Sequence, residues 1–217
     1  MEIDLLKNYP KAKRDLSERS QKKDEKNVAI ARKFEKDFFD GDRECGYGGF
    51  SYNPKYWQPV VPDFQKFYKL NNRHKILDIG CAKGFMMHDF LHFIPGIEIK
   101  GIDISNYAIK NCIETVKNLT RVANATNLPF GDNEFDLVIS INTIHNLDLE
   151  NCKKAISEII RVSKKNYFIT VDAYNNEEEK KRMYDWNLTA KTIMSVDEWK
   201  KLFKEVGYDG DYYWFIP

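Results

Sequence analysis

Two acidic residues and two glycines lie where the first two predicted strands end. Asp78 comes just before Gly80 and Gly84, which permit a tight turn and a close approach of a ligand to backbone N–H groups. The helix predicted from Phe85 would present its positive N-terminal end to that ligand. Asp103 ends the next strand, at roughly the 20-residue spacing from which a carboxylate accepts hydrogen bonds from ribose hydroxyls. Asp78 would repel a pyrophosphate but would suit a ligand with an ammonium and a sulfonium.

A polar segment follows the third predicted strand. The oxygen of Asn124 could accept from an adenine amino group, while the Ala125 N–H could meet a ring nitrogen. A plain turn before the buried Leu-Pro-Phe segment is the alternative, and both descriptions can hold together.

More polar residues follow the fourth and fifth predicted strands. Asn142 and His145 come just after strand four, and His145 could act as a base near neutral pH. Alternatively, His145 caps a helix or supports a loop. Asp172 and Tyr174 end strand five, where Asp172 could hold an acceptor amine or hydroxyl, or cap the next segment.

Aromatic residues form a candidate lid over this region. The segment YGGFSYNPKYW contains Tyr47, Tyr52 and Trp57, which could close over a ligand or simply pack the N-terminal part of the chain. In a late charged insertion, Arg182 and Trp186 could meet an anionic or planar acceptor, although Arg182 could equally be a solvated charge.

Strand and helix patterns alternate from residue 75 onward, which indicates a parallel sheet with crossover helices. Such sheets bind ligands outside the carboxyl ends of their strands. Strands are expected at KILDIG, IEIKGIDIS, RVANA, FDLVISI, NYFITVDAY and DYYWFIP, and helices at 85–93, after Ser105, at 149–162 and after a capping box at Ser195–Glu198.

The first 70 residues differ from this pattern. Residues 1–26 are highly charged and predict a solvated arm, and Ile30, Phe34 and Phe38 predict one helix that ends near Gly41. We therefore divide the single domain into residues 1–70, an arm, helix and aromatic lid, and residues 71–217, the ligand-binding part.

Four segments together resemble class I S-adenosylmethionine-dependent methyltransferases: ILDIGCAKG the first motif, GIDIS the ribose-binding acid, NATNLPF the adenine segment and FDLVISINTIHNL the fourth motif. The resemblance covers residues 75–217. It implies an α/β, Rossmann-like, seven-stranded and mostly parallel sheet with helices on both faces and an antiparallel last strand, here with an N-terminal cap. It also implies S-adenosylmethionine as cofactor, and no metal site is expected. The cofactor-binding candidates are Asp78, Gly80, Cys81, Ala82, Gly84, Phe85, Asp103, Ile104, Asn124, Ala125, Ser140 and Tyr47.

Two departures from the family pattern concern the cofactor. The family often has glycine at the position of Ala82 and an acid at the position of Asn124. The second change removes a charge-assisted hydrogen bond to adenine.

Bulk properties favour a small acceptor. The net charge of +1 makes a nucleic-acid partner unlikely, and there is neither a signal-peptide pattern nor a run suited to crossing a membrane. The four cysteines include no CxxC pair, which suits a cytoplasmic protein with reduced thiols. We expect methyl transfer to the oxygen or nitrogen of a small molecule, and the lid could close within one chain or in a homodimer. The alternatives are a nicotinamide-dependent oxidoreductase, a non-catalytic cofactor-binding protein, and an RNA or protein acceptor.

Overall fold

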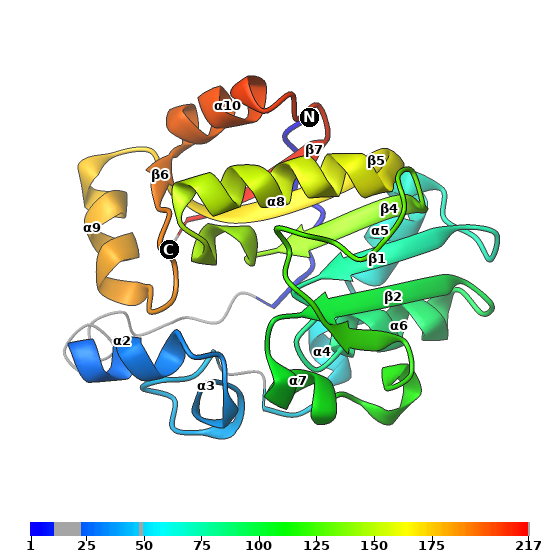
Figure 1. Ribbon diagram of the computed structural model, residues 1–217, viewed down its shortest axis with the longest axis horizontal. Coiled ribbons are helices and arrows are strands. Elements are labelled where there is room, and N and C mark those ends of the chain that lie inside the picture. Colours follow the sequence, from blue (N-terminus) through cyan, green and yellow to red (C-terminus); the bar gives the residue numbers. More distant parts are fainter. Residues whose placement is uncertain (11–22, 48–49, 217) are drawn as a thin grey trace.

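A single sheet, with helices on both faces, organises the chain. The computed structural model describes residues 1–10, 23–47 and 50–216 (Figure 1). The helices are α2 (Glu25–Ala31), α3 (Lys36–Asp40), α4 (Pro54–Trp57), α5 (Val61–Tyr68), α6 (Phe85–Phe93), α7 (Asn106–Lys110), α8 (Leu149–Val162), α9 (Glu177–Trp186) and α10 (Val196–Glu205), with short 3-10 turns η1 (Glu114–Val116) and η2 (Ile144–Asn146). The strands are β1 (Lys75–Ile79), β2 (Glu98–Asp103), β3 (Thr120–Val122), β4 (Phe135–Ile141), β5 (Ser163–Tyr174), β6 (Met194–Ser195) and β7 (Asp211–Phe215).

The strand order is β3-β2-β1-β4-β5, and both β6 and β7 pair with β5. The expected seven-stranded Rossmann-like sheet is therefore confirmed. The order reverses between β1 and β4, and this is the position where open α/β sheets bind their ligands.

The expected antiparallel last strand is wrong. β7 runs parallel to β5, in a register from Phe168 opposite Asp211 to Asp172 opposite Phe215. The reason is the connection: α10 carries the chain from β6 back across the sheet, and a helical crossover of this kind returns the next strand in the same direction.

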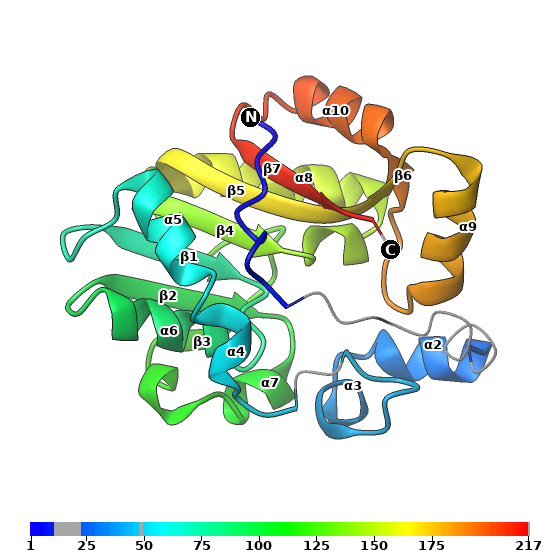
Figure 2. The same ribbon diagram turned by 180° about the vertical axis from the view of Figure 1, so that it is seen from behind.

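The two faces of the sheet have separate cores. α8 and α10 cover one face, and α5 and α6 cover the other (Figures 1 and 2). The fully buried Ile156 and Ile159 on α8 each contribute about 1.5–3 kcal/mol of burial free energy. α10 begins with the predicted capping box between Ser195 and Glu198. The predicted bounds of α8 and β4 are also confirmed.

The N-terminal part differs from the expectation in two ways. Residues 1–10 do not form a solvated arm: Leu5 is buried, and Ile3 N–H donates to the Tyr212 carbonyl of β7 (2.9 Å). The remaining arm residues 11–22 lie outside the described part. The single helix predicted around Ile30 is two helices, because Phe34 adopts a left-handed conformation (φ 52°) between α2 and α3.

The helix predicted after Ser105 is also shorter than expected. Ser105 caps α7 as predicted, but α7 ends at Lys110, and Val116 lies in the separate turn η1. Among the described residues, no helix has the length and apolar character that crossing a membrane requires.

Candidate cofactor and acceptor site

The loop after β1 has three residues, Gly80, Ala82 and Gly84, in the left-handed backbone conformation. Gly80 and Gly84 have φ values of 80° and 76°, and a Cβ on Gly80 would lie 2.1 Å from the Thr143 hydroxyl oxygen. Ala82 is also left-handed (φ 49°), which costs an alanine about 1–2 kcal/mol relative to glycine. Among the described residues, no side chain caps α6 at Gly84, so the first turn of α6 has backbone N–H groups available to a ligand.

Asp103 joins the loops after β1 and β2. One carboxylate oxygen accepts from the Ala82 N–H (2.9 Å), and the other accepts from the Ser105 N–H (2.8 Å). Burial raises the pKa of Asp103, and these backbone donors counteract the rise. A carboxylate has about four lone-pair sites, so Asp103 can still accept from a diol.

Asp78 lies near the end of β1, where the charge of Asp103 acts on it. It is 4% exposed, and burial, followed by the charge of Asp103, raises its pKa to about 7. Two nearby carboxylates in a buried position favour a cationic ligand, since a positive charge would restore the ionised form. Beside them, burial raises the pKa of the Cys81 thiol, which therefore stays neutral.

The adenine candidates lie on the β2 and β3 side. Ile104 is 56% exposed, so its side chain is open to contact. The Asn124 oxygen accepts from both the N–H and the hydroxyl of Thr126, each at 3.0 Å. These two bonds occupy both lone pairs of that oxygen, which leaves the Asn124 amide N–H groups and the Ala125 backbone to face a ligand.

The residues after β4 are held in a strained turn. Asn142 has φ 49°, its N–H donates to the Thr170 carbonyl, and its side-chain oxygen accepts from the Thr170 hydroxyl (2.9 Å).

Ser140 is fully buried within β4, and its hydroxyl has no hydrogen-bond partner in the described part of the chain.

His145 and Asp172 form a buried pair. The His145 Nδ1 accepts from the Asp172 N–H (3.0 Å), and its Nε2 lies 3.6 Å from Asp172 Oδ2. Burial lowers the pKa of His145, although the charge of Asp172 acts in the opposite direction. Asp172 Oδ2 also accepts from the Asn187 amide. In this arrangement Nδ1 is already occupied and Nε2 carries the proton, so the ring has no lone pair free for a substrate proton.

The aromatic lid candidates do not converge on one point. Tyr52 donates to Asp89 (2.6 Å) and packs edge-on against Phe85 (5.9 Å between centroids). Trp57 packs against Tyr9 (5.0 Å), as expected for packing of the N-terminal segment. Tyr47 stacks on Phe38 (5.4 Å). Residues 48 and 49 of this loop lie outside the described part.

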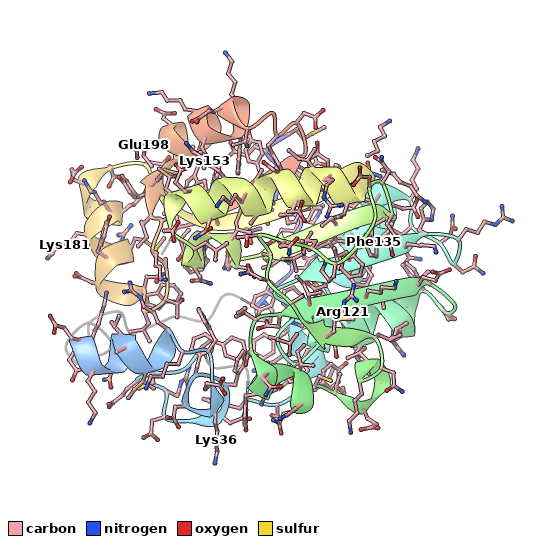
Figure 3. The ribbon with its side chains drawn as sticks, in the orientation of Figure 1. Lys36, Arg121, Phe135, Lys153, Lys181 and Glu198 are labelled. Carbon is pink, nitrogen blue, oxygen red and sulfur yellow. The ribbon has the colours of Figure 1, made fainter. Side chains whose placement is uncertain are left out.

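The candidate acceptor-binding residues in and before the late insertion each contact a different part of the molecule. Tyr174 reaches toward Glu198 of α10 (3.5 Å), Arg182 pairs with Glu178 on its own helix (3.1 Å), and Trp186 packs against Phe215 (5.1 Å). The side chains of Lys181 and Lys36 point away from the molecule (Figure 3).

Two adjoining hollows, of about 730 and 350 Å³, lie between α2 and residues 184–193. α2, α3 and α9 lie beyond the carboxyl ends of the central strands (Figures 1 and 2). Arg32 and Lys191 line the smaller hollow together with Asn187, which connects it to Asp172.

Lys83 is a site residue that the sequence did not single out. It lies in the glycine loop with 5% exposure, and its ammonium bonds to the Asp40 carboxylate and to the Phe50 carbonyl (2.7 Å). A lysine between two small residues carries no signal of a partner on a distant helix.

Comparison with known proteins identifies the family of the chain. The model of the family described as "Methyltransferase domain" matches residues 70–207. A tRNA (carboxymethyluridine(34)-5-O)-methyltransferase from Arabidopsis thaliana is 37% identical over 128 residues, covering 57% of this chain and 30% of that protein. The chain spans less than two thirds of the length of the curated relatives it matches first.

Solved structures agree on the fold. A methyltransferase from Archaeoglobus fulgidus superposes with a TM-score of 0.56 at 21% identity, over 79% of this chain and 72% of that one. A Haemonchus contortus phosphoethanolamine N-methyltransferase in complex with S-adenosyl-L-methionine gives 0.60 at 19% identity, over 82% and 44%. The chain belongs to the methyltransferase domain family, within the class I, Rossmann-like methyltransferases. S-adenosylmethionine is the cofactor of that class, and the paired acids and glycine loop fit it.

Proposed function

We propose that this chain transfers the methyl group of S-adenosylmethionine to an oxygen or nitrogen of a small polar molecule. The observation that carries the proposal is the pair of buried acids, Asp78 and Asp103, around a left-handed glycine loop at the switch in strand order. The hollow of about 350 Å³ lined by Asn187, whose amide donates to Asp172, has the size of a small-molecule pocket.

The cofactor roles follow from position. Asp103 would accept from the ribose hydroxyls, and the loop and the α6 N-terminus would hold the methionine part. Ile104, Asn124 and Ala125 would border adenine. The remaining proposed contacts, which follow the family pattern or the lid, are Cys81, Ala82, Phe85, Ser140 and Tyr47.

Transfer itself needs alignment more than proton chemistry. The acceptor atom, the methyl carbon and the sulfur must be nearly collinear, and positioning alone can supply much of the rate. Asn142, at the end of β4, is the proposed residue nearest the reacting methyl. We propose that His145 holds Asp172 in place and does not abstract a proton, because its Nδ1 already accepts the Asp172 N–H.

The acceptor would enter beside the insertion. Asp172, Tyr174, Arg182 and Trp186 border this side, whereas Tyr52 and Trp57 belong to the proposed cap. We also propose that the protein is cytoplasmic and that it forms a homodimer.

An RNA acceptor is the second candidate, because the Arabidopsis relative is named as a tRNA methyltransferase. The mixed charge of the chain, +1 overall, gives weaker support for RNA than for a small molecule.

Two measurements test these proposals. In calorimetric titration, S-adenosylmethionine and S-adenosylhomocysteine should bind and NADH should not; binding of NADH alone would support an oxidoreductase instead. Labelled methyl transfer should then be compared for a metabolite extract and for total tRNA. Label in the small-molecule fraction supports the main proposal, whereas label in tRNA replaces it with the second. Binding without transfer to either would indicate a non-catalytic protein.

A further inference from the structure

A buried lysine connects the glycine loop to the N-terminal cap, defined here as residues 24–47 and 50–57. Lys83 leaves the loop, and its ammonium contacts Asp40 of α3 and the Phe50 carbonyl. A lysine that is 5% exposed needs such partners, because an unpaired buried charge is strongly unfavourable.

The same carboxylate reaches a second loop. The other oxygen of Asp40 accepts from the Tyr107 hydroxyl (2.8 Å), and Tyr107 lies on α7, directly after β2. Burial raises the pKa of Asp40, but the hydrogen bonds from Lys83 and Tyr107, together with the charges of Lys83 and Lys36, lower it and the net shift is downward. Asp40 therefore stays ionised and holds the cap to the segments that follow β1 and β2, the strands that carry Asp78 and Asp103.

The backbone of Lys83 is part of the same arrangement. Its carbonyl accepts from the Ile113 N–H (2.9 Å), and its neighbours Ala82 and Gly84 are both left-handed. A side chain fixed at Lys83 therefore restricts a loop that has little other freedom. Fixing that loop before the ligand arrives lowers the entropy lost on binding.

We propose that Lys83 is a positioning residue that couples docking of the cap to binding at the glycine loop. This inference rests on the proposed function, since it takes the loop as the S-adenosylmethionine site. By thermodynamic reciprocity, a docked cap strengthens cofactor binding, and bound cofactor strengthens docking of the cap to the same extent.

The test compares Lys83→Met, Asp40→Asn and the double variant with Lys36→Met. Lys36 is the control for loss of a nearby charge, because it lies on α3 and its charge also lowers the pKa of Asp40, but its side chain points away from the molecule (Figure 3). Calorimetry gives the affinity for S-adenosylhomocysteine. Hydrogen exchange of residues 24–47, with and without the ligand, gives docking of the cap.

We expect Lys83→Met and Asp40→Asn each to weaken binding at least tenfold and to reduce ligand-induced protection of the cap. The double variant should lose much less than the product of the two single losses, and Lys83→Arg should recover part of the affinity. Lys36→Met should match wild type. If Lys83→Met does not fold, Asp40→Asn decides, because Asp40 lies on the partly exposed side of the pair.

The two proposals fail in different ways. A wild-type protein that binds no adenosyl ligand overturns the proposed function and this inference with it. A wild type that binds, together with folded variants that bind equally well and show the same cap protection, overturns the coupling alone.

Discussion

Cofactor affinity should depend on pH through Asp78. Burial and the charge of Asp103 raise its pKa to about 7, so the ligand-free protein holds a proton there in mildly acidic solution. A cationic ligand prefers the ionised form, and the apparent dissociation constant scales inversely with the ionised fraction. That fraction rises from about 3% at pH 5.5 to about 76% at pH 7.5, so affinity should increase about 25-fold across this interval.

The stability of the ligand-free protein should decrease, rather than increase, as pH rises. The folded state keeps the Asp78 proton up to about pH 7, whereas the unfolded chain loses it near pH 4. The free energy of unfolding contributed by this group therefore falls as pH rises between those values and is constant above.

Titration of S-adenosylmethionine, the ligand that carries the sulfonium charge, at half-unit pH steps checks the affinity trend. Asp78→Asn should bind more weakly at pH 7.5 and show a flat profile. Asp136→Asn is the control, because hydrogen bonds from Lys164 and the Lys75 N–H outweigh its burial and lower its pKa, so it stays ionised throughout. A flat wild-type profile, or a slope retained in Asp78→Asn, would refute the reasoning.

Three further changes test other parts of the site. Asp103→Asn keeps one acceptor but loses the charge, and should weaken adenosyl-ligand binding at least about 30-fold by calorimetry, equivalent to about 2 kcal/mol; unchanged affinity would remove the ribose role. His145→Gln keeps an acceptor for the Asp172 N–H, so kcat should be retained, whereas a general base would cost about a hundredfold or more. Burial lowers the pKa of His145, so the folded state favours the neutral ring. The free energy of unfolding of wild type, but not of His145→Gln, should therefore decrease through this group as pH falls below about 6.5. Gly80→Ala should lower Tm by about 5 °C or more, from left-handed strain plus the clash with Thr143; an unchanged Tm would contradict the backbone geometry.

Sequence patterns predicted the parts of the fold that depend on local chemistry. The bounds of β4 and α8, the Ser105 cap and the Ser195 capping box all follow from alternation, helical periodicity and capping. The glycine loop and its two acids were likewise recognisable, because left-handed turns and strand ends restrict which residues can occupy them.

Features of the fold and of the site that depend on contacts between distant residues were not predictable from the sequence. The direction of β7 is set by how α10 crosses the sheet, and the break at Phe34 is a conformation that its residue type does not favour. The partner of Lys83 lies on a separate helix of the cap. His145 has the right type and place for a base, and only its buried contact with Asp172 argues against that role.

The pairing of the N-terminal residues with β7 has a consequence for the order of folding. Ile3 bonds to Tyr212, and β7 in turn pairs with β5. During synthesis, this edge of the sheet therefore stays open until β7 has left the ribosome. Contacts between residues so far apart form slowly, and an unpaired strand edge invites association with other chains. We infer that the emerging chain passes through an aggregation-prone stage that ends when Ile3 bonds to Tyr212 of β7.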